Sequence, residues 1–130
     1  MRNLLKSSVL ILAFGCLVTG CGALLVAGAV GGAAGGALYV RGDLEALMDN
    51  PYDKVWVASQ AGLKDLGLGT KKARKGPEKA TIESYRLDGK KITIRITPQT
   101  KDRTKLSIRV GTFGDEVTSR EIYDAIKAHL

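Results

Sequence analysis

The residue with the most specific chemistry in this chain is Cys21, the last residue of the run Leu-Val-Thr-Gly-Cys at positions 17–21. A basic start with Arg2 and Lys6 precedes it, followed by an apolar stretch over about residues 9–18. A basic segment, an apolar segment and small residues before a thiol are typical of a bacterial lipoprotein signal. The pattern predicts a signal peptide over residues 1–20, cleavage before Cys21 and acylation of that cysteine.

This signal predicts where the mature protein resides. Gly22, rather than an aspartate, follows the cysteine, and the similarity to sorted lipoproteins therefore implies the outer membrane, with the protein facing the periplasm. Cys16 is a weaker acylation candidate because the bulky Phe14 stands two positions before it. An ordinary signal peptide, or a membrane anchor with an incidental cysteine, is the alternative.

An apolar, glycine-rich segment occupies residues 21–40 of the predicted mature chain. Gly28, Gly32 and Gly36 are spaced by four, so on a helix they form a smooth stripe that lets a second helix approach closely in lipid. Residues 23–40 would then associate with the membrane and with a second copy. Glycine costs about 1 kcal/mol per residue in a helix in water, however, so a flexible spacer beside the lipid anchor is equally compatible.

The remaining residues offer no catalytic constellation. His129 is the only histidine, and its place in the last turn of a predicted helix suits the helix dipole. A nucleophile–base pair cannot be built from these residues, and no metal-ligand spacing of cysteine and histidine is present. Asp115 and Glu116, beside two glycines, could hold a cation, or could simply lie at a helix N-terminus. We expect no enzymatic activity, no cofactor and no metal.

The charge of the chain favours acidic partners. The whole sequence carries +7, and removal of Arg2 and Lys6 leaves 18 basic and 13 acidic residues, or +5. Nucleic acid is not expected in the cell envelope, where lipid headgroups, lipopolysaccharide and acidic wall polymers are the available polyanions. Solubility alone is the alternative explanation. The basic segment at 70–79 is predicted to be a connection, either a headgroup-binding loop or a solvated one.

The charged residues of two predicted strands mark a candidate binding face. In residues 91–97 and 105–110, apolar and polar side chains alternate, which predicts strands with one buried face and one solvated face. Lys91, Arg95, Lys105 and Arg109 would share the solvated face and could bind an anionic ligand. Charges that only keep the face soluble are the alternative. Acidic counterparts such as Glu83 would instead favour a face covered by a partner or a second copy.

The elements that position this face are predicted from pattern. A first strand is expected within residues 39–47, a helix over about 51–66 capped by Asp49 or Asn50, and a strand over 79–87 that joins the next through a two-residue turn at Asp88-Gly89. A second helix is expected to begin at a capping box, Thr118-x-x-Glu121. Residues 41–130 thus predict an α+β domain, a two-layer sandwich of about four antiparallel strands with two helices on one face.

The run Ile-Arg-Val-Gly-Thr-Phe-Gly-Asp-Glu at 108–116, followed by Ser119, Ile122, Ile126 and Leu130, resembles a family of small bacterial lipoproteins of unknown function. The resemblance extends to Val55, Ala58, Leu63, Leu66 and Gly67 and to the N-terminal lipobox, and it covers about residues 40–130. It implies an α+β envelope domain and brings no activity and no site residues.

These features together predict a non-enzymatic, lipid-anchored envelope protein that acts as a structural or interaction module on the periplasmic side of the outer membrane. The alternative is a binding module for an anionic envelope ligand, which would use the basic sheet face.

Overall fold

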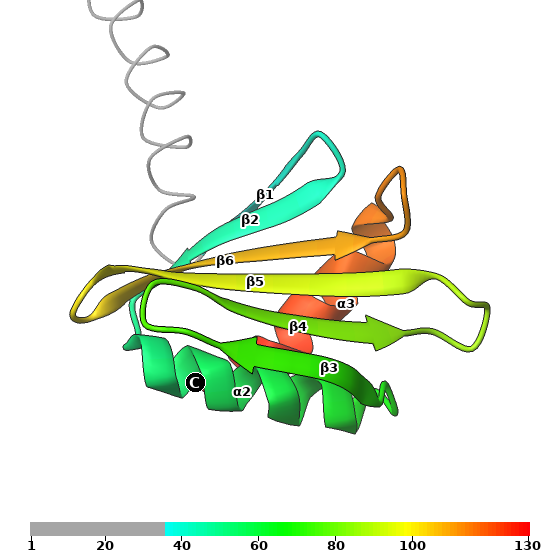
Figure 1. Ribbon diagram of the computed structural model, residues 1–130. Helices are drawn as coiled ribbons and strands as arrows, with labels where there is room; N and C mark the ends of the chain where they lie inside the picture. Colours follow the sequence, from blue (N-terminus) through cyan, green and yellow to red (C-terminus); the bar gives the residue numbers. More distant parts are fainter. Residues whose placement is uncertain (1–35) are drawn as a thin grey trace, which may run out of the picture. The chain divides into compact units, whose positions relative to one another are not determined.

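Six antiparallel strands form one sheet, and two helices cover one of its faces in the computed structural model, which describes residues 36–130 (Figure 1). The predicted signal peptide, Cys21, Gly28 and Gly32 lie outside the described residues, and Gly36 immediately precedes the first strand. The strands follow the spatial order β1-β2-β6-β5-β4-β3. Their bounds are β1 Ala37–Val40, β2 Asp43–Met48, β3 Thr70–Lys75, β4 Ala80–Tyr85, β5 Lys91–Thr100 and β6 Arg103–Val110.

The helices are α2, Tyr52–Asp65, and α3, Glu116–Lys127. Helix α3 packs against β6 and β2, whereas α2 packs against β5 and β3, and the two helices also contact each other. Both lie on the same side of the sheet (Figure 1). The opposite side, which we call the open face, is not covered by any element within residues 36–130.

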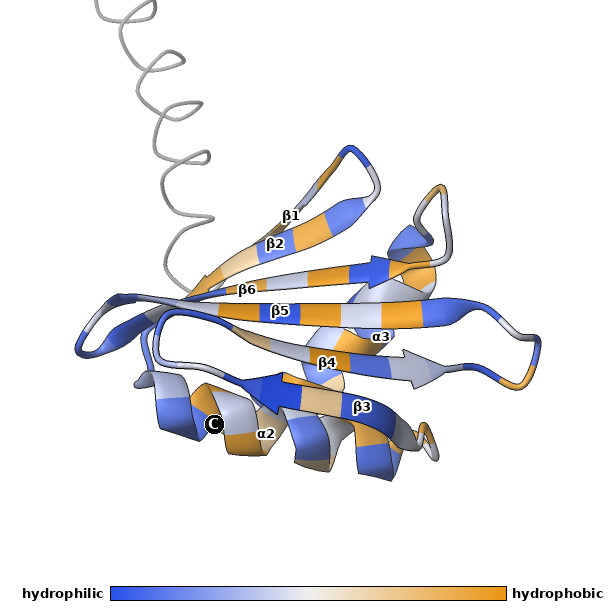
Figure 2. Ribbon diagram, viewed as in Figure 1, coloured by the Kyte–Doolittle hydropathy of each residue, from blue (hydrophilic) through white to orange (hydrophobic). Residues whose placement is uncertain are grey.

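The predicted alternation places the core between the sheet and the helices. Ile92, Ile94 and Ile96 of β5 are fully buried, and Ile94 pairs with Ile108 of β6. Figure 2 shows the resulting alternation of orange and blue along β5 and β6. Helices α2 and α3 add Val55, Leu63, Ile122 and Ile126, all fully buried. Full burial of such a side chain contributes roughly 1.5–3 kcal/mol, so these stripes hold the two layers together.

The fold class predicted from the sequence is confirmed, but the number of strands is not. The predicted strand within 39–47 is a hairpin of two strands, β1 and β2, which turns at Arg41 and Gly42, both with positive φ. The sheet therefore begins at Ala37, inside the segment considered as a glycine-rich helix or spacer.

The basic segment predicted as a connection supplies the sixth strand. Residues 70–75 form β3, the edge strand beside β4, and only 76–79 form the turn. Every side chain of β3 is exposed, and Ala73 is its only apolar residue, so no hydrophobic alternation marks it as a strand. Backbone pairing with β4, such as Lys72 opposite Glu83, forms this strand.

The helix ends and the β4–β5 turn differ in detail from the predictions. Helix α2 begins after Pro51 without a side-chain cap, so neither Asp49 nor Asn50 caps it. Helix α3 is capped by Asp115, which accepts a hydrogen bond from the Thr118 backbone N–H at 3.1 Å; the predicted capping box at Thr118 is therefore wrong. In the β4–β5 turn, the Arg86 N–H donates to the Lys90 carbonyl, so the loop is longer than two residues.

Candidate functional site

The open face brings together the four basic residues predicted to share it. Lys91 and Arg95 lie on β5, and Lys105 and Arg109 lie on β6, each alternating with buried neighbours. The strand register places Arg95 opposite Ser107, between Lys105 and Arg109 on the same strand. The sequence pattern therefore identified a real cluster of cations on one face.

Each of these four cations has an acidic partner on the same face. Lys91 Nζ lies 3.0 Å from Glu83 Oε1, and Lys105 Nζ lies 3.1 Å from Glu45 Oε2. Asp43 Oδ1 forms ion pairs with two arginines and lies 3.2 Å from Arg109 Nη1 and 3.9 Å from Arg95 Nη2. Four cations are thus matched by three acids from β2 and β4. Exposed ion pairs contribute little to stability, but they lower the attraction of this area for a free anion.

Arg109 has a further role in the structure. Its guanidinium donates to the Arg41 carbonyl at 3.3 Å and to the Thr112 carbonyl at 2.9 Å. It thereby joins the β1–β2 turn to the loop between β6 and α3. The two segments are close enough that a Cβ placed on Gly42 would lie 2.7 Å from the Phe113 carbonyl oxygen. Arg109 is therefore engaged in fixing two loops as well as in the charge network.

Glu83 and Lys91 stabilise each other's charge. The hydrogen bond from Lys91 lowers the pKa of the Glu83 carboxyl, and the positive charges of Lys91, Lys72 and Arg74 lower it further. The same hydrogen bond raises the pKa of the Lys91 ammonium. Both groups therefore stay ionised over a wider pH range than free side chains. The influence of Lys72 and Arg74 shows that positive potential extends to the β3 edge.

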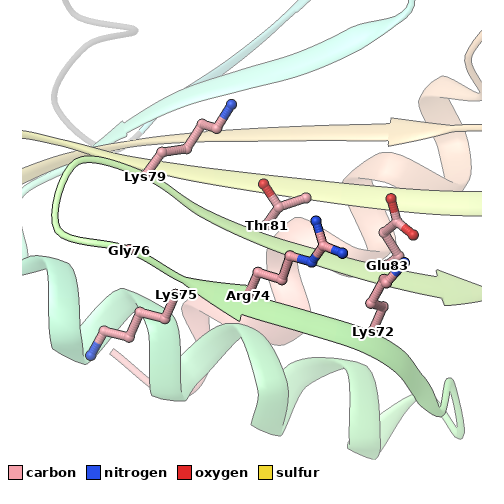
Figure 3. Close-up of a pocket in the computed structure, with 7 residues that line it drawn as sticks. All are labelled: Lys72, Arg74, Lys75, Gly76, Lys79, Thr81 and Glu83. Atoms are coloured by element: carbon pink, nitrogen blue, oxygen red, sulfur yellow. The ribbon is translucent and has the colours of Figure 1, made fainter.

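A second group of cations lies at this edge, around a hollow of about 470 Å³ on the open face. The residues that line the hollow come from β3, β4 and the turn between them: Lys72, Arg74, Lys75, Gly76, Lys79, Thr81 and Glu83. Figure 3 shows Lys72, Arg74, Thr81 and Glu83 on the same side of the two strands, whereas Lys75 points toward α2, where it pairs with Asp53. Among the residues that the structure describes, Lys72, Arg74 and Lys79 form no ion pair.

The sequence analysis considered residues 70–79 as a headgroup-binding or solvated loop, but it missed the strand that gives Lys72 and Arg74 a common face. The signal that could have identified it is the spacing of Lys72 and Arg74, which puts both side chains on one face of a strand. The acidic partners Asp43 and Glu45 were missed too. They belong to β2, which pairs with β6 across about 60 residues of chain, and such pairing leaves little local signature.

The other chemical candidates have structural roles. Asp115 caps α3 and lies 3.5 Å from Lys90, and the backbone N–H of Thr118 is the largest cause that lowers the pKa of its carboxyl. His129 Nε2 lies 2.5 Å from Asp65 Oδ2, which connects the C-terminal ends of α3 and α2. In the described range, no three histidine, cysteine or acidic side chains are grouped so that they could hold a metal ion. Residues 36–130 contain no helix that is long and apolar enough to cross a membrane.

Comparison with known proteins gives one family. The family model described as "Protein of unknown function (DUF3568)" matches residues 4–129, nearly the whole chain, and the protein belongs to this family. No curated protein matches the sequence.

Proposed function

We propose that this member of a family of unknown function is a lipid-anchored protein of the bacterial cell envelope, whose α+β domain is a non-enzymatic interaction module. The observation that carries the proposal is the chemistry of the open face. Its four central cations are each within 4 Å of one of three acids of the same chain, so a protein surface or a second copy can dock there with little uncompensated charge.

The tether defines the region in which the domain can act. Cys21 and Ala37 are separated by 16 residue steps, which span at most about 58 Å when fully extended. A chain acylated on Cys21 therefore keeps the sheet close to the bilayer surface. The outer membrane, with the domain facing the periplasm, is the proposed location.

The β1 edge supports a protein partner. Ala37–Val40 carries no charge, and its outward Leu38 and Val40 are 55% and 47% exposed. The opposite edge, β3, carries four cations, which hinder strand-to-strand association there. An uncharged, apolar edge beside the ion-paired part of the open face offers a partner both backbone pairing and burial of apolar surface.

Two measurements test the proposal. Intact mass spectrometry of the protein from membranes should show a chain that begins at Cys21 with added acyl mass, absent from Cys21→Ser. A photo-crosslinking side chain at Thr93, on the open face, should then capture a defined envelope protein or a second copy, whereas the same group at Glu121, exposed on α3, should not. An unprocessed chain would refute the lipid anchor at Cys21. Equal crosslinking at Thr93 and Glu121 would refute the open face as the partner-binding surface.

An anionic envelope ligand on the basic sheet face is the second candidate function. The uncompensated cations at the β3 edge favour it, because they leave that end of the open face positive. Salt-dependent binding of wall or lipopolysaccharide fragments that is lost on Arg95→Glu with Arg109→Glu would favour this candidate. Capture of a protein partner that is independent of salt would favour the interaction module.

A further inference from the structure

We infer that the hollow between β3 and β4 is a binding site for a phosphate group, held by Lys72, Arg74 and Lys79. The site differs from the face predicted from the sequence, since none of its three cations belongs to that set. It goes beyond the proposed interaction role, and it does not depend on the acylation of Cys21.

The distribution of ion pairs singles out this hollow. On the same sheet face, Lys91, Arg95, Lys105 and Arg109 are all within 4 Å of a carboxylate. In contrast, Lys72, Arg74 and Lys79 have no carboxylate partner among residues 36–130, although Glu83 lies at the border of the hollow and Lys75, which also lines it, pairs with Asp53. The Glu83 carboxylate accepts a hydrogen bond from Lys91 of β5, so it already has a cationic partner outside the hollow. Unpaired positive charge is thus concentrated in one concave region.

The positions of the donors suit an oxyanion. Lys72 and Arg74 project from the same face of β3, and Arg74 lies opposite Thr81 in the strand register. Figure 3 shows the Arg74 guanidinium and the Thr81 hydroxyl on the same side of the strands. Lys79, in the turn between β3 and β4, also lines the hollow.

Phosphate fits this donor set better than a carboxylate does. A guanidinium can donate two parallel hydrogen bonds to a phosphate, and the two ammonium groups and a hydroxyl can serve its remaining oxygens. A carboxylate has about four lone-pair sites, fewer than the roughly five hydrogen bonds that these four side chains offer when the guanidinium donates two. The hollow, at about 470 Å³, is also within the ordinary size of small-ligand sites and has room for a group esterified to the phosphate.

The competing explanation is that these cations only protect the β3 edge from pairing with another strand. The two explanations predict different results. A protective edge needs charge but no particular ligand, so its loss would increase aggregation without changing phosphate binding. A binding site loses affinity when its own cations are removed, and keeps it when cations elsewhere on the face are removed.

The test uses the purified full chain in a nonionic detergent, titrated with inorganic phosphate and with glycerophosphoglycerol, the deacylated form of a lipid headgroup. Backbone amide NMR shifts should move at residues 72–81 and saturate. Lys72→Gln with Arg74→Gln should weaken binding by about tenfold or more. Arg95→Gln with Lys105→Gln removes the same charge from the same face and should change binding by less than about twofold.

The outcomes separate the explanations. Preference for inorganic phosphate would indicate a free phosphate ligand, preference for glycerophosphoglycerol a lipid headgroup, and either supports the site. Equal loss in both double variants would show attraction by net charge only and would overturn it. Shifts that do not saturate, or aggregation of the Lys72/Arg74 variant with unchanged affinity, would also overturn it. Lys72 and Arg74 are exposed and Arg95 and Lys105 are partly exposed, and thermal melting of each variant verifies the fold. Failure of this test would leave the crosslinking result at Thr93 unaffected.

Discussion

Replacing Gly62 by alanine should destabilise the domain, although the same change in an open helix would stabilise it. Gly62 lies on α2 where the helix meets α3. A Cβ at this position would lie 2.7 Å from the backbone nitrogen of Ile126 and 2.9 Å from the carbonyl carbon of Ala125. Ordinary van der Waals contact begins near 3.4 Å, so the helices must separate by about 0.7 Å.

The magnitude follows from two opposing effects. Forcing an extra methyl group into a close-packed contact costs about 1–3 kcal/mol, and here the obstructing atoms are helical backbone that cannot rotate away. Alanine gains about 1 kcal/mol over glycine in helix propensity. We therefore expect a net loss of about 1 kcal/mol in the free energy of unfolding. For a domain of this size, that loss lowers Tm by roughly 4–8 °C.

Urea unfolding and thermal melting, both followed by far-ultraviolet circular dichroism, measure the effect. Gly69→Ala is a matched control, because nothing lies within 4 Å of its added Cβ, and it should change stability by less than about 0.5 kcal/mol. Ala61→Gly, the adjacent and partly buried position on α2, reports mainly the propensity effect and should cost about 1 kcal/mol. A Gly62→Ala protein as stable as wild type, or more so, would refute the reasoning that these helices are in backbone contact.

Three further substitutions test the site and its supports. Asp115→Ala should cost about 1 kcal/mol because α3 loses its N-cap, as urea unfolding would show. Because the pKa of Asp115 is lowered in the folded state, this stabilisation is present above the ordinary pKa of 3.8 and is lost as the pH falls through the lower folded value. The difference in free energy of unfolding between wild type and Asp115→Ala should therefore become smaller in acid. Glu83→Gln should reduce the acid sensitivity of stability for the same reason, and an unchanged pH profile would contradict the lowered pKa of Glu83. Arg109→Ala should cost about 1 kcal/mol and speed amide exchange in residues 41–42 and 111–114, whereas Arg95→Ala, whose guanidinium is 3.9 Å from Asp43, should change both little.

The strands that were predicted well are those whose pattern is local. Residues 91–97 and 105–110 alternate between apolar and polar side chains because one face of each strand packs on the helices, and both were recovered with the correct inward residues. The first helix was also placed within one or two residues, because its apolar residues follow helical spacing. In these elements, the pattern of apolar residues is enough to show which side chains are buried.

The elements that were missed are hairpin strands that have no clear hydrophobic alternation of their own. β3 has no buried side chain, and it is a strand only because β4 offers an unpaired edge to its backbone. The division of residues 39–47 into β1 and β2 requires a tight turn at Arg41-Gly42, where Arg41 adopts a positive φ that its residue type does not favour. Neither the strand β3 nor the turn at Arg41-Gly42 produces a hydrophobic periodicity that can be recognised in the sequence.

The candidate site shows the same division. The amino-acid sequence alone determined which cations share the face of β5 and β6, since alternation along a strand is a property of the backbone itself. Only the tertiary structure decided which of those cations are neutralised, because Asp43 and Glu45 reach them through the pairing of β2 with β6. It also decided that Lys72, Arg74 and Lys79 surround a hollow without a carboxylate partner in the described domain. Charge type is local to a residue, whereas its compensation depends on the whole register of the sheet.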